Sequence, residues 1–365
     1  MSAVWLHIGQ CGNQIGWDWW NLITRDDILK TEGDRYPFFN HDSHLAAVFV
    51  DSEPKVLRRL QRKVQRRYLQ ESNLIFGRKG RGSNWAYGYH GPHSETEETS
   101  LLCRTMECLR KEVEKRDCYN GMVMLHSLSG GTGSGLGAHL CEAVRDEYPL
   151  GHILSVSVSP YRTGECPLQH YNSLLCLSWL QRCGISIGME PWELLRSVCP
   201  VPSTKFLCLN HISKRGTAFW DSMSSSVVHM LQRQSHLGKP YYSTSVLAVA
   251  RGNHDNSFFS SVDSVLSKLK QGYRCASWNP FPIDYWTDPQ NVVDPLPHSQ
   301  SLTVCANHSS VTGHLQHVIE KARAMYQSRG YLHWYWKYGC EDEDFQEAFE
   351  TLQFIVDSYN SAEEQ

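Results

Sequence analysis

Apolar residues in the first half of the chain fall into short continuous runs, separated by segments with helical spacing. Four of these runs are typical of buried strands, at residues 3–8, 45–50, 122–128 and 153–158. The first and third runs each lead through a glycine-rich loop into a helical pattern. Strands that alternate with helices in this way predict a mostly parallel sheet with helices on both faces. Such sheets bind ligands at the loops that follow the carboxyl ends of the strands.

The second half of the chain is less regular. Apolar runs predict strands at 205–209, 245–250 and 302–307, and helical spacing predicts helices at 261–269 and 312–327. Residues 279–297 are rich in Pro and Asp, which predicts mostly loop. Near the end of the chain, four apolar side chains form one helical stripe: Phe345, Phe349, Leu352 and Ile355.

The length of 365 residues leaves room for about two domains. The chain has 13 cysteines but no Cys-x-x-Cys pair, and it has neither a leader-like N-terminus nor an apolar run that could span a membrane. These features favour a cytosolic protein with reduced, buried thiols. They predict neither secretion nor contact with a membrane.

The net charge of −3 hides an uneven distribution. Residues 55–81 contain ten Lys or Arg and one acid, whereas residues 341–365 contain nine acids and no Lys or Arg. Apolar residues at helical spacing in 55–68 place the cations on the opposite face, which favours an ordinary solvated helix surface. A surface for an acidic partner or for nucleic acid is the alternative. Nucleic acid is the less favoured partner because the total charge is slightly negative.

A glycine-rich loop between a strand and a helix carries the clearest candidate chemistry. It reads Gly130-Gly131-Thr132-Gly133-Ser134-Gly135. Glycines let backbone N–H groups approach phosphate oxygens, hydroxyls add donors, and the following helix contributes positive potential. The loop matches neither the dinucleotide fingerprint nor the P-loop, so a simple tight connection is the alternative. Loops at 9–16, 51–53 and 80–84 in the same half strengthen the phosphate interpretation.

The glycine loop resembles the tubulin signature, and residues 7–16 resemble the tubulin N-terminus. The similarity continues through four further segments: 84–88, 171–172, 332–335 and 343–345. Residues 87–92 and 110–115 are most similar to the divergent delta and zeta tubulins of centrioles and basal bodies.

The resemblance implies a fold class and a domain order. We expect an α/β protein with a doubly wound, mostly parallel-sheet GTPase domain of the Rossmann-like tubulin type over residues 1–183. A smaller α/β intermediate domain over 184–325 and a C-terminal helical segment over 326–365 would follow.

The resemblance also implies a GTP-binding cytoskeletal subunit. Its partners would be other tubulin subunits or components of microtubules and centrioles, and its location the cytoplasm, cytoskeleton, centriole, basal body or cilium. Weak, assembly-dependent GTP hydrolysis is the most that we expect. Tubulins hydrolyse GTP with an acid donated by a neighbouring subunit, for which Glu190 and Glu193 are the candidates.

The implied site for GTP or GDP can be carried over residue by residue. Its expected nucleotide contacts are Gln10, Cys11, Gln14, Gly82, Ser83, Gly130, Gly131, Thr132, Gly133, Ser134, Gly135, Tyr171 and Asn172. Asp51 and Glu53 match the acidic pair that holds Mg²⁺, usually through waters. Ser83 stands where an Asn is usual, and Arg81 stands where tubulins have a small residue. Glu165 and Gln169 match acidic positions only approximately.

A large part of the tubulin pattern is absent. After 177–182 the chain passes through 183–189 into 191–195, which resembles a region well beyond the central helix of tubulins. That helix supplies contacts to the guanine base. We therefore expect a chain that keeps the phosphate contacts and lacks much of the base pocket. The alternatives are a truncated variant that binds no GTP and acts as a protein-binding module, and a soluble enzyme for another phosphorylated ligand.

Overall fold

A computed structural model describes most of the chain. The described residues are 3–24, 38–63, 68–94, 96, 98–161, 166–183, 197–201, 203–216, 220–235, 238–252, 256–291, 293–294, 296 and 298–362. The chain divides into two compact units. The first comprises Met1–Pro191 and Val318–Leu352, and the second comprises Trp192–His317 and Gln353–Gln365. The domain boundaries expected from the sequence remain a prediction.

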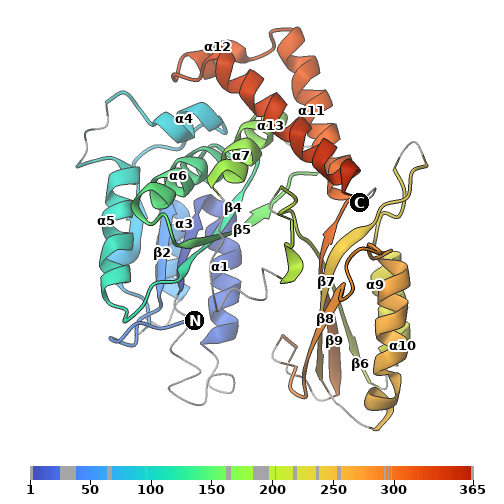
Figure 1. Ribbon diagram of the computed structural model, residues 1–365. Helices are drawn as coiled ribbons and strands as arrows, with labels where there is room; N and C mark the ends of the chain where they lie inside the picture. The colour runs from blue at the N-terminus through green and yellow to red at the C-terminus, as the bar shows by residue number, and fades with distance from the viewer. Residues whose placement is uncertain are drawn as a thin grey trace. The chain divides into compact units, whose positions relative to one another are not determined.

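The first unit contains a five-stranded sheet in the order β3-β2-β1-β4-β5, with every neighbouring pair parallel (Figure 1). Its strands are β1 (Ala3–Ile8), β2 (Ala47–Asp51), β3 (Leu74–Phe76), β4 (Gly121–Ser127) and β5 (His152–Val158). The expected doubly wound α/β architecture is confirmed.

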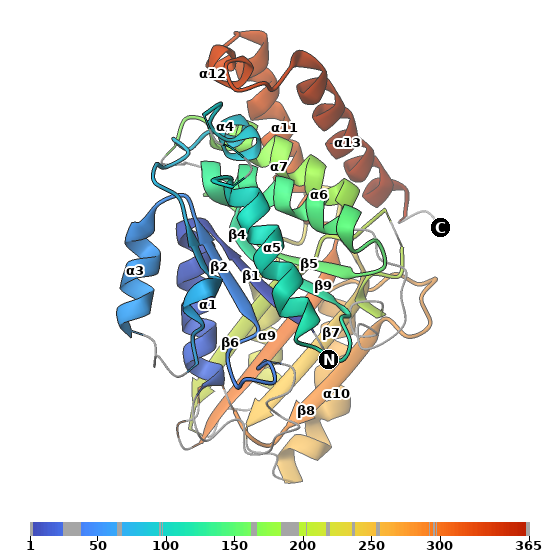
Figure 2. The same ribbon diagram turned by 90° about the vertical axis from the view of Figure 1, so that its left-hand side faces the viewer.

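Helices cover both faces of this sheet (Figure 2). They are α1 (Gly9–Ile23), α3 (Pro54–Lys63), α5 (Leu101–Glu114) and α6 (Gly137–Glu147). Two further helices, α4 (Trp85–His90) and α7 (Gln169–Cys183), contact the glycine-rich segment 131–136. Side chains alternate along each strand, so one face of β1 packs with α5 and α6 while the other packs with α1 and α3. Leu6 and Trp5 illustrate the alternation, because Leu6 joins the core with Leu140 and Trp5 joins the core with Trp20.

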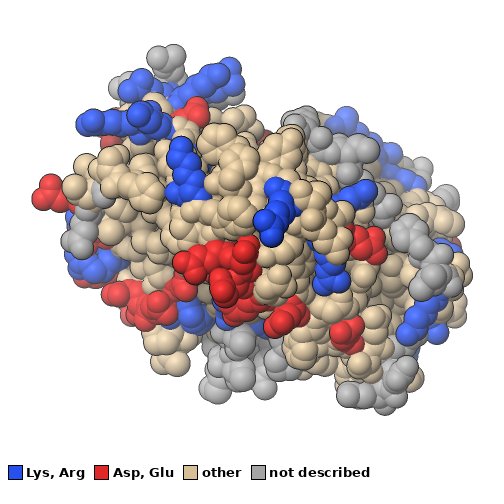
Figure 3. Space-filling model, turned by 90° about the horizontal axis from the view of Figure 1, so that it is seen from above, with Lys and Arg blue, Asp and Glu red and all other residues tan. Residues whose placement is uncertain are grey.

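Three helices near the C-terminus are α11 (Val311–Gln327), α12 (Leu332–Trp336) and α13 (Asp342–Ser361). The predicted apolar stripe on α13 is buried at all four positions, as the spacing required. Its first turn carries Asp342, Glu343 and Asp344. Figure 3 shows acidic side chains gathered in a patch on the face seen from above.

The second unit contains a four-stranded sheet in the order β6-β9-β7-β8. Its elements are β6 (Cys208–Arg215), α9 (Trp220–His229), β7 (Ser243–Gly252), α10 (Asn256–Gly272), β8 (Ile283–Asp288) and β9 (Ser299–His308). Apolar residues of α9 and α10 pack on this sheet in one core. Residues 279–297, expected to be mostly loop, contain one strand, β8, and their other described residues are loop. This edge strand exposes most of its side chains, so it lacks the apolar pattern by which strands are recognised.

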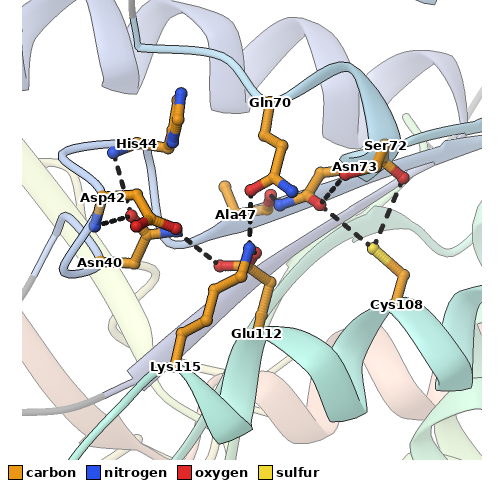
Figure 4. Close-up of polar contacts among 10 residues, drawn as sticks. All are labelled: Asn40, Asp42, His44, Ala47, Gln70, Ser72, Asn73, Cys108, Glu112 and Lys115. Atoms are coloured by element: carbon orange, nitrogen blue, oxygen red, sulfur yellow. Dashed lines mark hydrogen bonds and ion pairs between the residues drawn. The ribbon is translucent and has the colours of Figure 1, made fainter.

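Buried polar contacts fasten the sheet of the first unit at the amino ends of its strands (Figure 4). The Glu112 carboxylate is fully buried and accepts hydrogen bonds from Lys115 Nζ at 2.7 Å and from Asn40 Nδ2 at 3.3 Å. Lys115 Nζ also donates to Gln70 Oε1 at 2.7 Å. These bonds connect α5 to the segments on either side of β2, at the end of the sheet opposite the glycine loop.

Among the described helices, none combines the length and the apolar content needed to cross a membrane.

Candidate nucleotide site

Three loops leave one edge of the parallel sheet, at the carboxyl ends of β1, β2 and β4. Ile8 is in register with Val50, and His7 is in register with Leu125, so the three strands end close together. The loops begin at Gly9, at Asp51 and after Ser127. This edge therefore brings together most of the residues expected to contact a nucleotide, and we call it the cradle.

The glycine loop packs directly against the backbone of residues 81–88. Residues Gly131–Leu136 form one turn of π-helix before α6. A Cβ added to Gly131 would lie 2.5 Å from the Arg81 carbonyl oxygen, and a Cβ added to Gly135 would lie 2.1 Å from the Trp85 carbonyl oxygen. A Cβ on Gly9 would lie 3.1 Å from the backbone N of Gly133. The absence of side chains at these glycines is what allows three segments to meet in the cradle.

Hydrogen bonds connect the glycine loop to the acidic loop after β2 and to a histidine on β4. The Thr132 and Ser52 hydroxyl oxygens lie 2.6 Å apart, which links the glycine loop to the acidic loop. His126 is fully buried beneath the loop, and its Nδ1 lies 2.9 Å from the Gly133 carbonyl oxygen. Burial lowers the pKa of His126 to about 4, so the ring is neutral at physiological pH. Because a carbonyl only accepts, Nδ1 carries the proton and donates it to Gly133.

Asn172 is fully buried and commits its amide to the loops around it. Its Nδ2 donates to the Ser83 and Ser129 carbonyl oxygens, each at 2.7 Å. Its Oδ1 accepts from the Trp85 backbone N–H at 2.8 Å and from the Tyr335 hydroxyl at 2.7 Å. All the hydrogen-bonding capacity of the amide is thus used within the chain. The Asn172 side chain thus joins the segments at Ser83 and Ser129 to α12, and its expected contact with nucleotide remains a prediction.

Tyr171, the other expected contact on α7, is also fully buried. Its ring packs edge-on against Tyr335 and Phe345, with centroids 5.3 Å and 5.0 Å away. Its contacts therefore support the start of α7. Gln169 is buried too, and its Nε2 donates to the Tyr161 carbonyl oxygen at 3.2 Å.

Asp51 and Glu53 lie at the end of β2 and differ in their surroundings. Asp51 is buried and its Oδ1 accepts the Glu53 backbone N–H at 3.3 Å, whereas the Glu53 side chain is exposed. Burial is the largest cause that raises the pKa of the Asp51 carboxyl to about 6, and the neighbouring Glu53 charge adds to it. A cation beside the pair would relieve this repulsion. Two carboxylates with nearby hydroxyls are a donor set that suits Mg²⁺.

A groove of about 760 Å³ lies between α1 and α3. Its walls include Gln10 and Gln14, and on α3 the side chains Lys55, Arg58 and Arg59. This volume falls within the roughly 300–1,000 Å³ of small-molecule sites. Between the two glutamines, the Cys11 side chain is partly exposed, and burial raises the pKa of its thiol. The thiol is therefore protonated at neutral pH and is a weak nucleophile.

In a comparison with known protein families, residues 2–199 match the family described as "Tubulin/FtsZ family, GTPase domain". The chain belongs to the tubulin/FtsZ family. It is 26% identical to the tubulin delta chains of Macaca fascicularis and Homo sapiens, in alignments that cover 98% of this chain and 99% of each relative. It is 25% identical to the nucleomorph tubulin beta chain of Guillardia theta, over 98% of this chain and 95% of that relative. The expected likeness to divergent, delta-type tubulins is confirmed.

The alignment also shows that many positions of a tubulin delta chain are missing from this chain. The alignment with the Macaca fascicularis chain runs over 457 positions, 92 more than the 365 residues of this chain. At least 92 aligned positions of that relative thus have no counterpart here. The large absence expected from the sequence agrees with this difference in length.

Two departures from the tubulin pattern lie in the segment that faces the glycine loop. Arg81, which stands where a small residue is usual, is buried, and its guanidinium carbon lies 5.3 Å from the centroid of the Tyr87 ring. Gly82 and Ser83 have φ angles of 55° and 52°, in the left-handed region. Asn adopts this conformation more readily than Ser, so the Asn that tubulins usually have at the position of Ser83 suits the backbone better.

Some features of the cradle were not expected from the sequence. Ser52 and His126 hold the glycine loop but were not among the predicted site residues. The position of Ser52 between two acids of a candidate loop was the available signal. Nothing in the sequence distinguishes His126 from any other histidine on a buried strand. Glu165, Glu190 and Glu193 lie outside the described residues.

Proposed function

We propose that this tubulin-family cytoskeletal protein binds GTP or GDP at the cradle. The observation that carries the proposal is the convergence of the Gly9, Asp51 and Gly130–Gly135 loops at one sheet edge, linked by the contact between Ser52 and Thr132. Backbone N–H groups of the glycine loop would bind the phosphates, with the hydroxyls of Thr132 and Ser134 as further donors. Gln10, Cys11, Gln14, Gly82 and Ser83 would line the remainder of the site.

Asp51 and Glu53 would hold Mg²⁺ beside the phosphates. When bound, Mg²⁺ would neutralise part of the phosphate charge. In the described part of the chain, no group of three or more His, Cys, Asp or Glu side chains gathers closely enough to hold a metal by itself. The acidic pair therefore fits a cation that takes most of its ligands from phosphate and water. Weak hydrolysis, dependent on assembly with a neighbouring subunit, is the most activity that we propose.

The proposed partners are other tubulin subunits in the cytoplasm, at centrioles, basal bodies or cilia. The resemblance of residues 87–92 and 110–115 to the delta and zeta tubulins of centrioles and basal bodies supports the centriolar assignment.

Calorimetric titration of the purified chain with GTP tests the proposal. We expect binding in the presence of Mg²⁺ and weaker binding when EDTA removes it. The double substitution Asp51→Asn with Glu53→Gln should abolish the difference between Mg²⁺ and EDTA. The matched control is Asp146→Asn with Glu147→Gln, which removes two exposed acids near the end of α6 and should leave binding unchanged.

A second function competes with this one because at least 92 aligned positions are missing. Without them the chain would be a nucleotide-independent protein-binding module. A folded chain that sediments with microtubules but gives no signal with GTP or GDP would support this function and overturn nucleotide binding.

A further inference from the structure

The groove between α1 and α3 carries an unbalanced positive charge. One wall presents Gln10, Gln14 and Trp17, which recur at the spacing of a single helix face. The other presents Lys55, Arg58 and Arg59, again on one face. Among the described residues that line the groove, one is an acid, Asp18. Three cations against one carboxylate leave the groove suited to an anion.

The cations of the groove differ from those on the exposed face of α5. On α5, Arg110 pairs with Glu107 at 2.9 Å and also with Glu114. By contrast, no ion pair within the described part of the chain involves Lys55, Arg58 or Arg59, and the Arg58 guanidinium carbon lies 5.9 Å from the centroid of the exposed Phe76 ring. All three side chains are exposed. They can therefore reorient toward a ligand without first breaking an ion pair with the described part of the chain.

Both walls of the groove begin at loops of the cradle. Gln10 follows Gly9, which approaches the glycine loop, and Lys55 stands two residues after Glu53 of the acidic pair. Figure 2 shows α3 beside α1, on one side of the sheet that ends in the cradle. A chain of phosphates seated on the glycine loop thus has a cationic groove next to it. Guanidinium groups bind phosphate oxygens through paired hydrogen bonds that carry charge on both partners.

We propose that Lys55, Arg58 and Arg59 bind phosphate oxygens of the nucleotide, so that the number of phosphates selects the ligand. The favoured ligand class is a nucleoside triphosphate over the corresponding diphosphate and monophosphate. The inference rests on the proposed nucleotide binding at the cradle and assigns α3 a part in it. It replaces the interpretation of these three cations as an ordinary solvated helix surface.

The experiment compares GTP, GDP and GMP by calorimetric titration at low and at physiological salt. The groove variant is Arg58→Gln with Arg59→Gln, which keeps the helix propensity and the aliphatic stems. We expect its affinity for GTP to fall roughly tenfold or more, because two charge-assisted contacts are lost. The loss for GDP should be smaller, and GMP should be unaffected. Higher salt should weaken GTP binding to the wild type more than to the variant.

Two controls separate charge at the groove from charge in general. Lys321→Gln with Arg329→Gln removes two exposed cations of the same unit that do not line the groove, and should leave the GTP affinity unchanged. Arg58→Lys with Arg59→Lys should restore part of the affinity. Thermal unfolding of each variant shows whether the fold is intact.

The outcomes distinguish this inference from the function on which it rests. If the wild type binds none of the three nucleotides, nucleotide binding fails and the inference fails with it. If the wild type binds GTP and the groove variant binds it equally well, the inference alone is overturned. If the groove variant keeps its GTP affinity but loses binding to a poly-glutamate peptide, the groove is a site for an acidic protein segment and the inference is again overturned.

Discussion

Asp51 places a carboxylate where water is largely excluded, next to the exposed carboxylate of Glu53. Burial and the Glu53 charge both disfavour the ionised form, and the backbone N–H groups of Glu53 and Ser52 offset only part of this effect. The chain thus keeps a costly charge at the edge of the sheet. A cost of this kind is common where a side chain is held for a ligand.

Asp51→Asn should stabilise the fold when neither nucleotide nor Mg²⁺ is present. The pKa of Asp51 is about 6 in the folded chain against its usual 3.8, so above pH 6 the folded state carries a buried charge that unfolding releases to water. Between pH 6 and pH 4 the folded state takes up a proton before the unfolded state does, and the penalty disappears. We expect the substitution to raise the free energy of unfolding by about 1–3 kcal/mol at pH 8.

Urea denaturation of the wild type and of Asp51→Asn at several pH values measures this difference. The gain should shrink steadily as the pH falls from 6 to 4. Glu53→Gln serves as a comparison, because its side chain is exposed and its neutralisation should change the free energy of unfolding less. A gain that is constant with pH would mean that the charge of Asp51 is not its cause.

At the scale of elements, the sequence predicts best where burial is complete. β1 follows the expected run of Ala3 to Ile8 residue for residue, because a strand buried on both faces is largely apolar, with His7 as the exception here. Helical spacing in the sequence predicts one long helix over residues 95–115. In the structure α5 begins only at Leu101, where the Ser100 side chain accepts the backbone N–H of Cys103 at 3.5 Å. Its extra residues were assigned from spacing alone, which does not locate a cap.

The contacts of the site were predictable only in part. A glycine loop after a strand indicates a phosphate site by its composition. Asn172, in contrast, takes its role from partners as far along the chain as Ser83 and Tyr335. The spacing of residues within one segment carries no information about such distant partners. The sequence therefore could not show that the amide of Asn172 is fully hydrogen-bonded inside the chain.

The glycines of the phosphate loop differ in how closely other atoms approach them, so substitutions at two of these glycines can be compared. Gly135→Ala should be strongly destabilising, because its Cβ would lie 2.1 Å from the Trp85 carbonyl oxygen and 2.8 Å from Gly88 Cα. We expect a loss of about 2 kcal/mol or more in the free energy of unfolding, together with loss of GTP binding. Gly130→Ala should change stability little, since nothing lies within 4 Å of its Cβ.

Denaturation and nucleotide titration of the two variants distinguish the effect of a steric clash at one glycine from the effect of losing any glycine of the loop. Both substitutions remove one glycine from the same loop and keep every backbone N–H. Equal effects of the two would contradict the view that the loop needs glycine for its approach to residues 81–88. In that case the loop would need its glycines only for backbone flexibility.

Over the whole molecule, the phosphate side of the cradle is better equipped than the base side. Glycine backbone, hydroxyls and carboxylates surround the expected phosphates, whereas the alignment leaves at least 92 positions of a full-length relative without a counterpart. On the α1 side of the site, the described residues offer the base two side-chain amides, Gln10 and Gln14. An amide both donates and accepts, so either purine can satisfy it.

The chain should therefore discriminate poorly between GTP and ATP. A site built to hydrogen-bond one particular group rejects an analogue by roughly four orders of magnitude, whereas a site without such groups does so only weakly. We expect the dissociation constants of GTP and ATP to agree within about tenfold. Displacement of a fluorescent GTP analogue by unlabelled GTP, ATP and inorganic triphosphate would measure them side by side. Displacement by ATP and triphosphate at similar concentrations fits recognition through phosphate, while a GTP preference above about a hundredfold would require a base pocket built from the present chain.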